Sequence, residues 1–262
     1  MPTKLDEIVE NKKLEVAARI QSRSLDSFRD KVVNANHEFA AALRQPGVNL
    51  ICEVKPKSPS AGVLRGAVNV DDILKSYNKH ARAVSVLTDE KYFGGSLELL
   101  AEISEKSQLP TLCKDFVIDV YQCYEARECG AKAVLLIVKI LNDEQLQTLY
   151  ACIQNLGMDA IVEVQTEDEM QRALSIKPSI IMINNRNLST FEMDLGTTER
   201  LAARVPSDTI LISASGILEK SDMERLLPVC SNFLIGSALM KSDNMEELMA
   251  ELANMSVPAR SK

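Results

Sequence analysis

From residue 48 onward, short apolar runs alternate with longer stretches whose apolar positions recur at a helical period. Continuous apolar strands separated by amphipathic helices are typical of a parallel sheet buried on both faces. Eight runs have this character: residues 48–54, 83–87, 111–113, 133–138, 160–164, 180–183, 209–212 and 233–235. Eight strand–helix units predict an α/β fold, a (β/α)8 barrel. An open doubly wound sheet is the alternative, but no G-x-G-x-x-G motif follows the first run.

The first 46 residues predict a helical extension that precedes the barrel. Leu5, Ile8, Val16 and Ile20 recur near helical spacing with Lys and Glu between them. A second helix is expected over about residues 25–43, and the sequence Gln-Pro-Gly at 45–47 ends the pattern. No linker-like stretch interrupts the chain, so residues 1–262 are expected to form a single domain.

Composition and charge exclude several classes of protein. The chain is 46% hydrophobic and 26% charged, which argues against disorder, and its net charge of −7 argues against a nucleic-acid partner. No apolar run approaches the ~18 residues of a membrane helix, and the charged N-terminus does not resemble a secretory signal. We therefore expect a cytoplasmic protein, and a monomer is the default.

The cysteines and histidines do not form a recognisable metal motif. None of the six cysteines belongs to a C-x-x-C pair, and His37 and His80 stand alone. Neither a zinc site nor a disulfide framework is expected, and small buried thiols in a reducing cytoplasm are the simpler interpretation.

Charged and amide side chains stand at the carboxyl ends of four predicted strands, where barrel enzymes place their chemistry. They are Glu53, Lys55, Lys114, Glu163, Asn184 and Arg186. Residues two apart share a strand face, so Glu53 and Lys55 are expected to point into the same opening. Solvated loop starts are the alternative for any one of them. Together they favour a site for acid–base chemistry, because carboxylates and lysines in a cleft tune each other's pKa.

Small residues follow the seventh and eighth predicted strands. Ser215-Gly216 and Gly236-Ser237 stand where barrel enzymes commonly bind phosphate through backbone N–H groups. Glycine lets the backbone approach an anion closely. Ordinary turns are the alternative, but the coincidence at both strands favours a phosphate site.

A long loop with prolines and glycines, residues 56–66, follows the first predicted strand. Its prolines stiffen the chain and its glycines allow it to bend. It fits either a lid that excludes water from the opening or a disordered surface loop, and the sequence does not decide between them.

Six motifs follow one another along the predicted barrel. The first is Glu53-x-Lys55-x-x-Ser58-Pro59-Ser60, and the others lie at residues 85–96, 112–127, 162–164, 183–188 and 234–240. In this order they resemble the indole-3-glycerol phosphate synthase family of tryptophan biosynthesis. The two N-terminal helices also fit the extension of that family. Because the chain stops after the eighth unit, it resembles the monofunctional enzyme.

The resemblance implies a reaction without metal or cofactor. The substrate would be 1-(2-carboxyphenylamino)-1-deoxyribulose 5-phosphate, and the products indole-3-glycerol phosphate, carbon dioxide and water. Lys114 would be the general acid, Glu163 would transfer a proton in the dehydration, Lys55 would assist by charge, and Glu53 would hold the lysines. The resemblance also implies binding residues: Ser58, Asn184 and Arg186 for the ring and its carboxylate, Phe93, Phe116, Leu135 and Leu188 for the aromatic wall, and Ser215, Gly216, Gly236 and Ser237 for the phosphate.

Two positions depart from the family pattern. Ala214 stands where the family normally has Glu, which leaves the rate in doubt, and Asn187 stands where Asp is common. Two rival functions therefore stay open. One is a paralogue that binds the phosphate ligand without efficient catalysis. The other is a different sugar-phosphate barrel, such as an isomerase. The motifs that contain Glu53, Lys55 and Lys114 argue against this alternative.

Overall fold

Eight parallel strands close into a barrel in the computed structural model, which describes residues 3–58, 62–63, 69–187, 192–242 and 244–258. The strands follow one another around the barrel in chain order, and β1 pairs with both β4 and β10 to close it. Their bounds are β1 Asn49–Val54, β4 Ala83–Leu87, β5 Thr111–Lys114, β6 Ala133–Ile137, β7 Asp159–Val164, β8 Ile180–Asn184, β9 Ile210–Ala214 and β10 Asn232–Ile235. The predicted (β/α)8 barrel is confirmed, with each strand within two residues of its expected ends.

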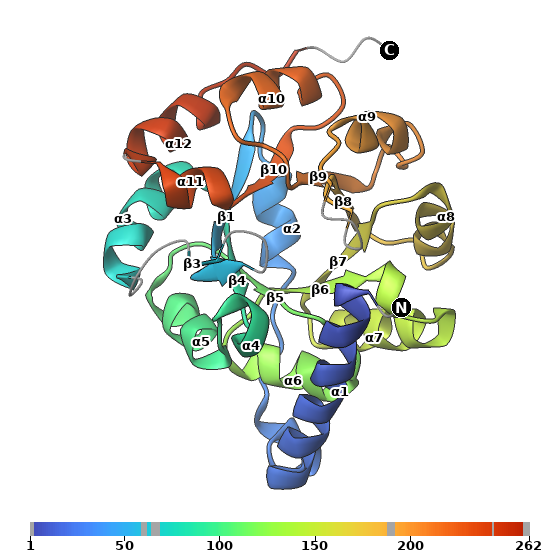
Figure 1. The fold of residues 1–262 in the computed structure, drawn as a ribbon. Coiled ribbons are helices and arrows are strands. Elements are labelled where there is room, and N and C mark those ends of the chain that lie inside the picture. The colour runs from blue at the N-terminus through green and yellow to red at the C-terminus, as the bar shows by residue number, and fades with distance from the viewer. Residues whose placement is uncertain (1–2, 59–61, 64–68, 188–191, 243, 259–262) are drawn as a thin grey trace.

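Helices surround the barrel, as Figure 1 shows. Most begin at a polar cap; Ser96, Asp119 and Asn142, for example, accept hydrogen bonds from first-turn amides. The outer helices are α3 Val70–His80, α5 Leu97–Lys106, α6 Val120–Glu128, α7 Asp143–Asn155, α8 Glu167–Ser175, α9 Gly196–Ala202, α10 Lys220–Leu226 and α12 Met245–Ala253. The apolar pattern does not predict α12, nor the short helices α4 Glu90–Phe93 and α11 Ser237–Lys241 or the 3₁₀ turn Val138–Ile140.

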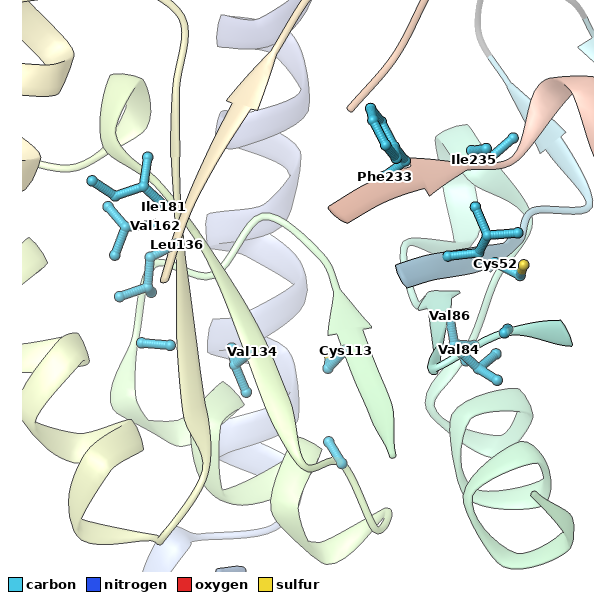
Figure 2. Packing of buried hydrophobic residues seen from close by; sticks show 14 of the residues in the cluster. Cys52, Val84, Val86, Cys113, Val134, Leu136, Val162, Ile181, Phe233 and Ile235 are labelled. Atoms are coloured by element: carbon cyan, nitrogen blue, oxygen red, sulfur yellow. The ribbon is translucent and has the colours of Figure 1, made fainter. Parts of the chain in front are cut away.

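Alternation along each strand divides the core into two layers. Outward-facing residues such as Cys52, Val84 and Val162 pack against the helices (Figure 2). Inward-facing residues such as Ile51 and Leu112 fill the barrel in a second cluster. The same period of two therefore points the next inward positions, at the carboxyl ends, into the mouth of the barrel.

The N-terminal extension contains one long helix, α1 Lys4–Ser22, as predicted. The prediction of a single second helix over residues 25–43 is wrong. That stretch holds two 3₁₀ turns, Leu25–Ser27 and Arg29–Lys31, and the six-residue helix α2 Glu38–Leu43.

Tertiary hydrogen bonds explain why the second helix does not form. The amides of Ala35 and His37 donate to the carbonyls of Leu156 and Gly157 after α7, both at 2.9 Å. These amides are therefore not available for the hydrogen bonds of a helix. The two segments approach so closely that a Cβ on Gly157 would lie 2.0 Å from the carbonyl oxygen of Ala35. Beyond this segment, Phe39 and Leu43 of α2 join the cluster that fills the barrel.

The loop after β1 contains a small antiparallel ladder, which the sequence does not predict. It joins β2 Lys57–Ser58 to β3 Gly62–Val63. Residues 59–61 and 64–68 lie outside the described ranges. The hypothesis that this loop acts as a lid stays a prediction.

Helix α1 lies beside α6 (Figure 1). A buried carboxyl of α6 meets an arginine of α1 there. The carboxylate of Glu125 lies 3.4 Å from the guanidinium of Arg19. Burial raises the pKa of Glu125 from 4.5 to about 7, although Arg19 opposes this shift. The folded protein therefore holds a proton that the unfolded chain releases at lower pH.

We expect stability to fall as the pH rises through 7, because the folded state then bears a buried negative charge that water would solvate better. The contribution of Glu125 is at most about 3 kcal/mol, fully present below pH 4.5 and lost above about pH 7. Urea unfolding of wild type and Glu125→Gln between pH 5 and 8 measures it, and the variant should lose this part of the pH dependence. The control is Glu128→Gln on the same helix, which pairs with Arg23 near the surface. Parallel curves for wild type and Glu125→Gln would contradict the assignment.

Candidate active site

A cavity of about 390 Å³ opens at the carboxyl ends of the barrel strands. Thirteen of the fifteen predicted site residues line it: Glu53, Lys55, Phe93, Lys114, Phe116, Leu135, Glu163, Asn184, Arg186, Ser215, Gly216, Gly236 and Ser237. Leu188 lies outside the described residues, as does the side chain of Ser58. Segments up to about 180 residues apart in the sequence thus contribute to one opening.

A buried carboxylate joins two lysines in this cavity. The two carboxylate oxygens of Glu53 lie 2.6 Å from Lys55 Nζ and 3.5 Å from Lys114 Nζ. Burial opposes ionisation of Glu53, but the two ammonium groups outweigh it and lower its pKa to about 2. Glu53 is therefore a permanent anion that holds both lysines at the end of β1, while each ammonium keeps N–H groups to offer to a ligand.

A second buried carboxyl, Glu163, faces the same space from β7. It is 2% exposed and accepts a hydrogen bond of 3.1 Å from Asn184 Nδ2 on β8. Burial raises its pKa, although Lys114 and Asn184 oppose the shift. Asn184 is fixed in turn because its Oδ1 accepts the amide of Arg186 at 3.0 Å. The site thus holds one carboxylate locked in its charged form beside another poised to exchange a proton.

Aromatic and aliphatic side chains wall one side of the cavity. The ring centroids of Phe93 and Phe116 are 6.0 Å apart with planes tilted by 39°. Leu135 and Ile137 from β6 join them on the lining. An apolar wall of this kind suits a planar aromatic group, because it removes the ring from water and leaves the polar contacts to the opposite wall.

The opposite end of the cavity is built from small residues. Ser215 and Gly216 have positive φ angles of 67° and 77°, a left-handed turn that few non-glycine residues adopt. Buried Asn185 holds this turn by donating to the carbonyl of Ser215 at 3.1 Å and to Ser213 Oγ at 3.0 Å. Gly236 and Ser237 begin α11, where first-turn amides have no partner within the helix. The arrangement can accept an anion.

Several lining residues are missing from the prediction made from sequence. Asp115, Leu218, Met193 and Lys241 line the cavity as well. Lys241 could be found from its spacing, one helical turn after Ser237. Met193 and Leu218 follow no strand directly and carry no signal in the sequence.

Other candidate sites are less suited to catalysis. A hollow of about 490 Å³ between the 3₁₀ turns of the extension and helices α6 and α7 is lined by no carboxylate or lysine. In the described ranges, no three His, Cys, Asp or Glu side chains gather as a metal site would need. Within the same ranges, no helix has the length and apolar character needed to cross a membrane.

Comparison with known proteins assigns this architecture to one family. Residues 5–252 match the family model described as indole-3-glycerol phosphate synthase. The chain is 40% identical over 256 residues to the indole-3-glycerol phosphate synthase of Lachnospira eligens, covering 94% of this chain and 96% of that protein. For the protein of the same name from Albidiferax ferrireducens, identity is 42% over 258 residues, covering 95% and 97%.

Some relatives are longer than this chain. The tryptophan biosynthesis protein TrpCF of Vibrio cholerae is 40% identical over 242 residues, which cover 92% of this chain and 52% of that protein. The chain thus spans about half the length of the TrpCF relatives it matches. Among solved structures, 3-hexulose-6-phosphate synthase from Salmonella typhimurium has a TM-score of 0.64 at 11% identity, covering 78% of this chain and 96% of that one. At that identity the likeness shows the barrel fold alone.

Proposed function

Since the chain belongs to the indole-3-glycerol phosphate synthase family, we propose that it converts 1-(2-carboxyphenylamino)-1-deoxyribulose 5-phosphate to indole-3-glycerol phosphate, carbon dioxide and water. One observation carries the proposal. Glu53 holds Lys55 and Lys114 in a cavity that also contains the Glu163–Asn184 pair. That cavity offers acid–base groups between an aromatic wall and an anion cradle, which matches a substrate with a ring at one end and a phosphate at the other.

Binding bends the substrate toward ring closure. The phosphate occupies the turn at Ser215 and Gly216 and the start of α11 at Gly236 and Ser237. The aromatic ring lies against Phe93, Phe116 and Leu135. Anchoring both ends brings the ring carbon that bears the carboxylate close to the ketone carbon, which lowers the entropic cost of the reaction.

Ring closure requires a proton on the ketone oxygen. The attack forms a carbon–carbon bond while the C=O π electrons move to oxygen, and Lys114 donates the proton that oxygen needs. Lys55 stabilises the developing charge, and Asn184 and Arg186 orient the carboxylate of the ring. Loss of carbon dioxide returns the bonding pair to the ring.

Dehydration completes the indole. The hydroxyl formed on the former ketone carbon leaves as water with a proton supplied by a lysine, and Glu163 accepts the proton that is lost as the double bond forms. Burial raises its pKa above the ordinary value of a carboxyl, which makes its carboxylate a better proton acceptor. No step needs a metal or a redox group.

A fluorescence assay tests the function directly. Purified protein is mixed with the carboxyphenylamino sugar phosphate, and formation of the fluorescent indole is followed with time. We expect turnover that saturates with substrate and is absent when the protein is left out. A folded protein that forms no indole would overturn the proposal.

Gly236 offers a test of the geometry around Glu53. A Cβ at this position would lie 2.5 Å from Glu53 Oε1, so alanine must push the carboxylate away from the lysines. We expect Gly236→Ala to lower kcat/KM by about 10-fold or more, since small displacements of catalytic groups are costly. A crystal structure of the variant should show a displaced Glu53; an unmoved carboxylate with full activity would contradict this.

Ala214 favours a second candidate function. It lies 2% exposed on the cavity wall, in register with Asn184, and offers no carboxylate to the lysines. The missing carboxylate would be consistent with a protein that binds the indole product and hardly turns over substrate. Ala214→Glu distinguishes the two. We expect it to change kcat by less than about 10-fold, because Glu53 already holds both lysines; a large gain over an almost inactive wild type would favour the binding protein.

We further propose that residues 1–262 form one domain, that the protein is a monomer and that it acts in the cytoplasm. All six cysteines are free, which suits a reducing compartment. Light scattering of the purified protein tests the monomer, and fractionation of cells that express it tests the location.

A further inference from the structure

Lys12 belongs to helix α1, which precedes all the barrel strands in the sequence, and its side chain is buried. Its side chain is 1% exposed and forms three ion pairs, with Asp115 at 2.9 Å, Glu15 at 2.9 Å and Asp89 at 3.1 Å. Burial disfavours its charge, but Asp115 and Asp89 raise its pKa above the ordinary value. A fully buried lysine is unusual unless it is paired, so these carboxylates account for its position.

The two aspartates hold the loops that carry the aromatic wall. Asp89 follows β4 and accepts the amides of Tyr92 at 2.8 Å and Phe93 at 3.2 Å, which caps α4. Asp115 follows β5 and accepts the amide of Phe116 at 2.7 Å. Each aspartate therefore fixes the backbone of one of the two facing rings.

Lys12 links these loops to each other. In the described part of the chain, the second oxygen of Asp89 has no hydrogen-bond donor, and Lys12 Nζ is its ion-pair partner. Asp115 has one further tie to the β4 loop, because Thr88 Oγ1 donates to it at 2.8 Å. Without the ammonium, the two buried carboxylates lose the counter-ion that they share, and the link between the two loops is weakened.

We propose that Lys12 is a positioning residue of the active site: from the N-terminal extension it sets the separation of Phe93 and Phe116, and thereby the grip on the aromatic end of the substrate. The inference rests on the proposed function for the identity of that substrate. Lys114 is held separately by Glu53, so Lys12 acts mainly on binding. Helix α1 is then part of the substrate site, although no residue of it lines the cavity.

Replacing Lys12 by glutamine tests the proposal, with Lys13→Gln as the matched control. Lys13 is the next residue of the same helix, 56% exposed and paired with Glu10. We expect Lys12→Gln to raise KM about 10-fold while kcat changes less than about threefold, and Lys12→Arg to recover most of the loss. Hydrogen exchange should become faster at residues 88–93 and 114–117 in Lys12→Gln and not in Lys13→Gln.

The exchange measurement needs no substrate, so it separates the two proposals. If wild type makes no indole, the proposed function falls, whereas the coupling of α1 to the two loops is still decided by exchange. Equal exchange and equal KM in Lys12→Gln and Lys13→Gln would overturn the inference, as would a fall in kcat with KM and exchange unchanged. If Lys12→Gln does not fold, Asp89→Asn decides, because it removes the ion pair with Lys12 while its amide oxygen can still accept the amides of Tyr92 and Phe93. A KM and loop exchange equal to wild type in that variant would overturn the inference.

Discussion

Lys114→Ala should lower kcat by about 10²-fold or more, the usual contribution of a positioned general acid. The ammonium at the end of β5 faces the cavity and lies 3.5 Å from Glu53, so it is oriented before substrate binds. Alanine leaves the ketone oxygen without that donor, while Lys55 stays tied to Glu53 by its 2.6 Å contact. Initial rates of indole formation across substrate concentrations measure kcat and KM separately.

Lys132→Ala is the control for this variant. Lys132 precedes β6 at the opposite end of the barrel and pairs with Glu38 at 2.8 Å. The substitution therefore removes a lysine side chain far from the cavity. It should keep wild-type kcat. Wild-type turnover in Lys114→Ala would remove Lys114 from the mechanism.

Glu163→Gln should also lower kcat by about 10²-fold, with little change in KM. Glutamine has nearly the same shape and can still bond to Asn184, so the cavity keeps its form while the group can no longer exchange a proton. Because burial raises the pKa of Glu163, its charged form appears at a higher pH than for an ordinary carboxyl. If it accepts the proton in dehydration, kcat of the wild type falls as the pH drops through that raised pKa.

The pH profile provides the decisive readout. The acidic fall in kcat should disappear in Glu163→Gln and persist in Glu169→Gln. Glu169 is another buried carboxyl with a raised pKa, but it caps the first turn of α8 and does not line the cavity. A Glu163→Gln enzyme with wild-type kcat and an unchanged acidic limb would refute the role.

Much of the barrel can be predicted from sequence because its rules are local. A parallel strand buried on both faces must be apolar throughout, so each run marks a strand within two residues. The period of two then places Glu53, Lys114, Glu163 and Asn184 on the inner face at the same end. Their convergence on one cavity follows from barrel closure and needs no knowledge of distant contacts.

The errors occur where distant partners decide the structure. The segment before α2 has a helical pattern, but its amides bond to carbonyls about 120 residues away. Glu125 resembles any exposed glutamate of an amphipathic helix until α1 packs over it.

The sequence by itself determined the barrel, the order of its strands and the set of polar groups at its mouth, since these depend on residues a few positions apart. Tertiary structure alone decided that Glu53 binds two lysines at once. It also decided that Lys12, which in the sequence looks like any charged residue of a polar helix, is buried among three carboxylates. The physical reason is that burial and charge pairing are properties of surroundings, and these surroundings come from segments that meet only when the chain folds.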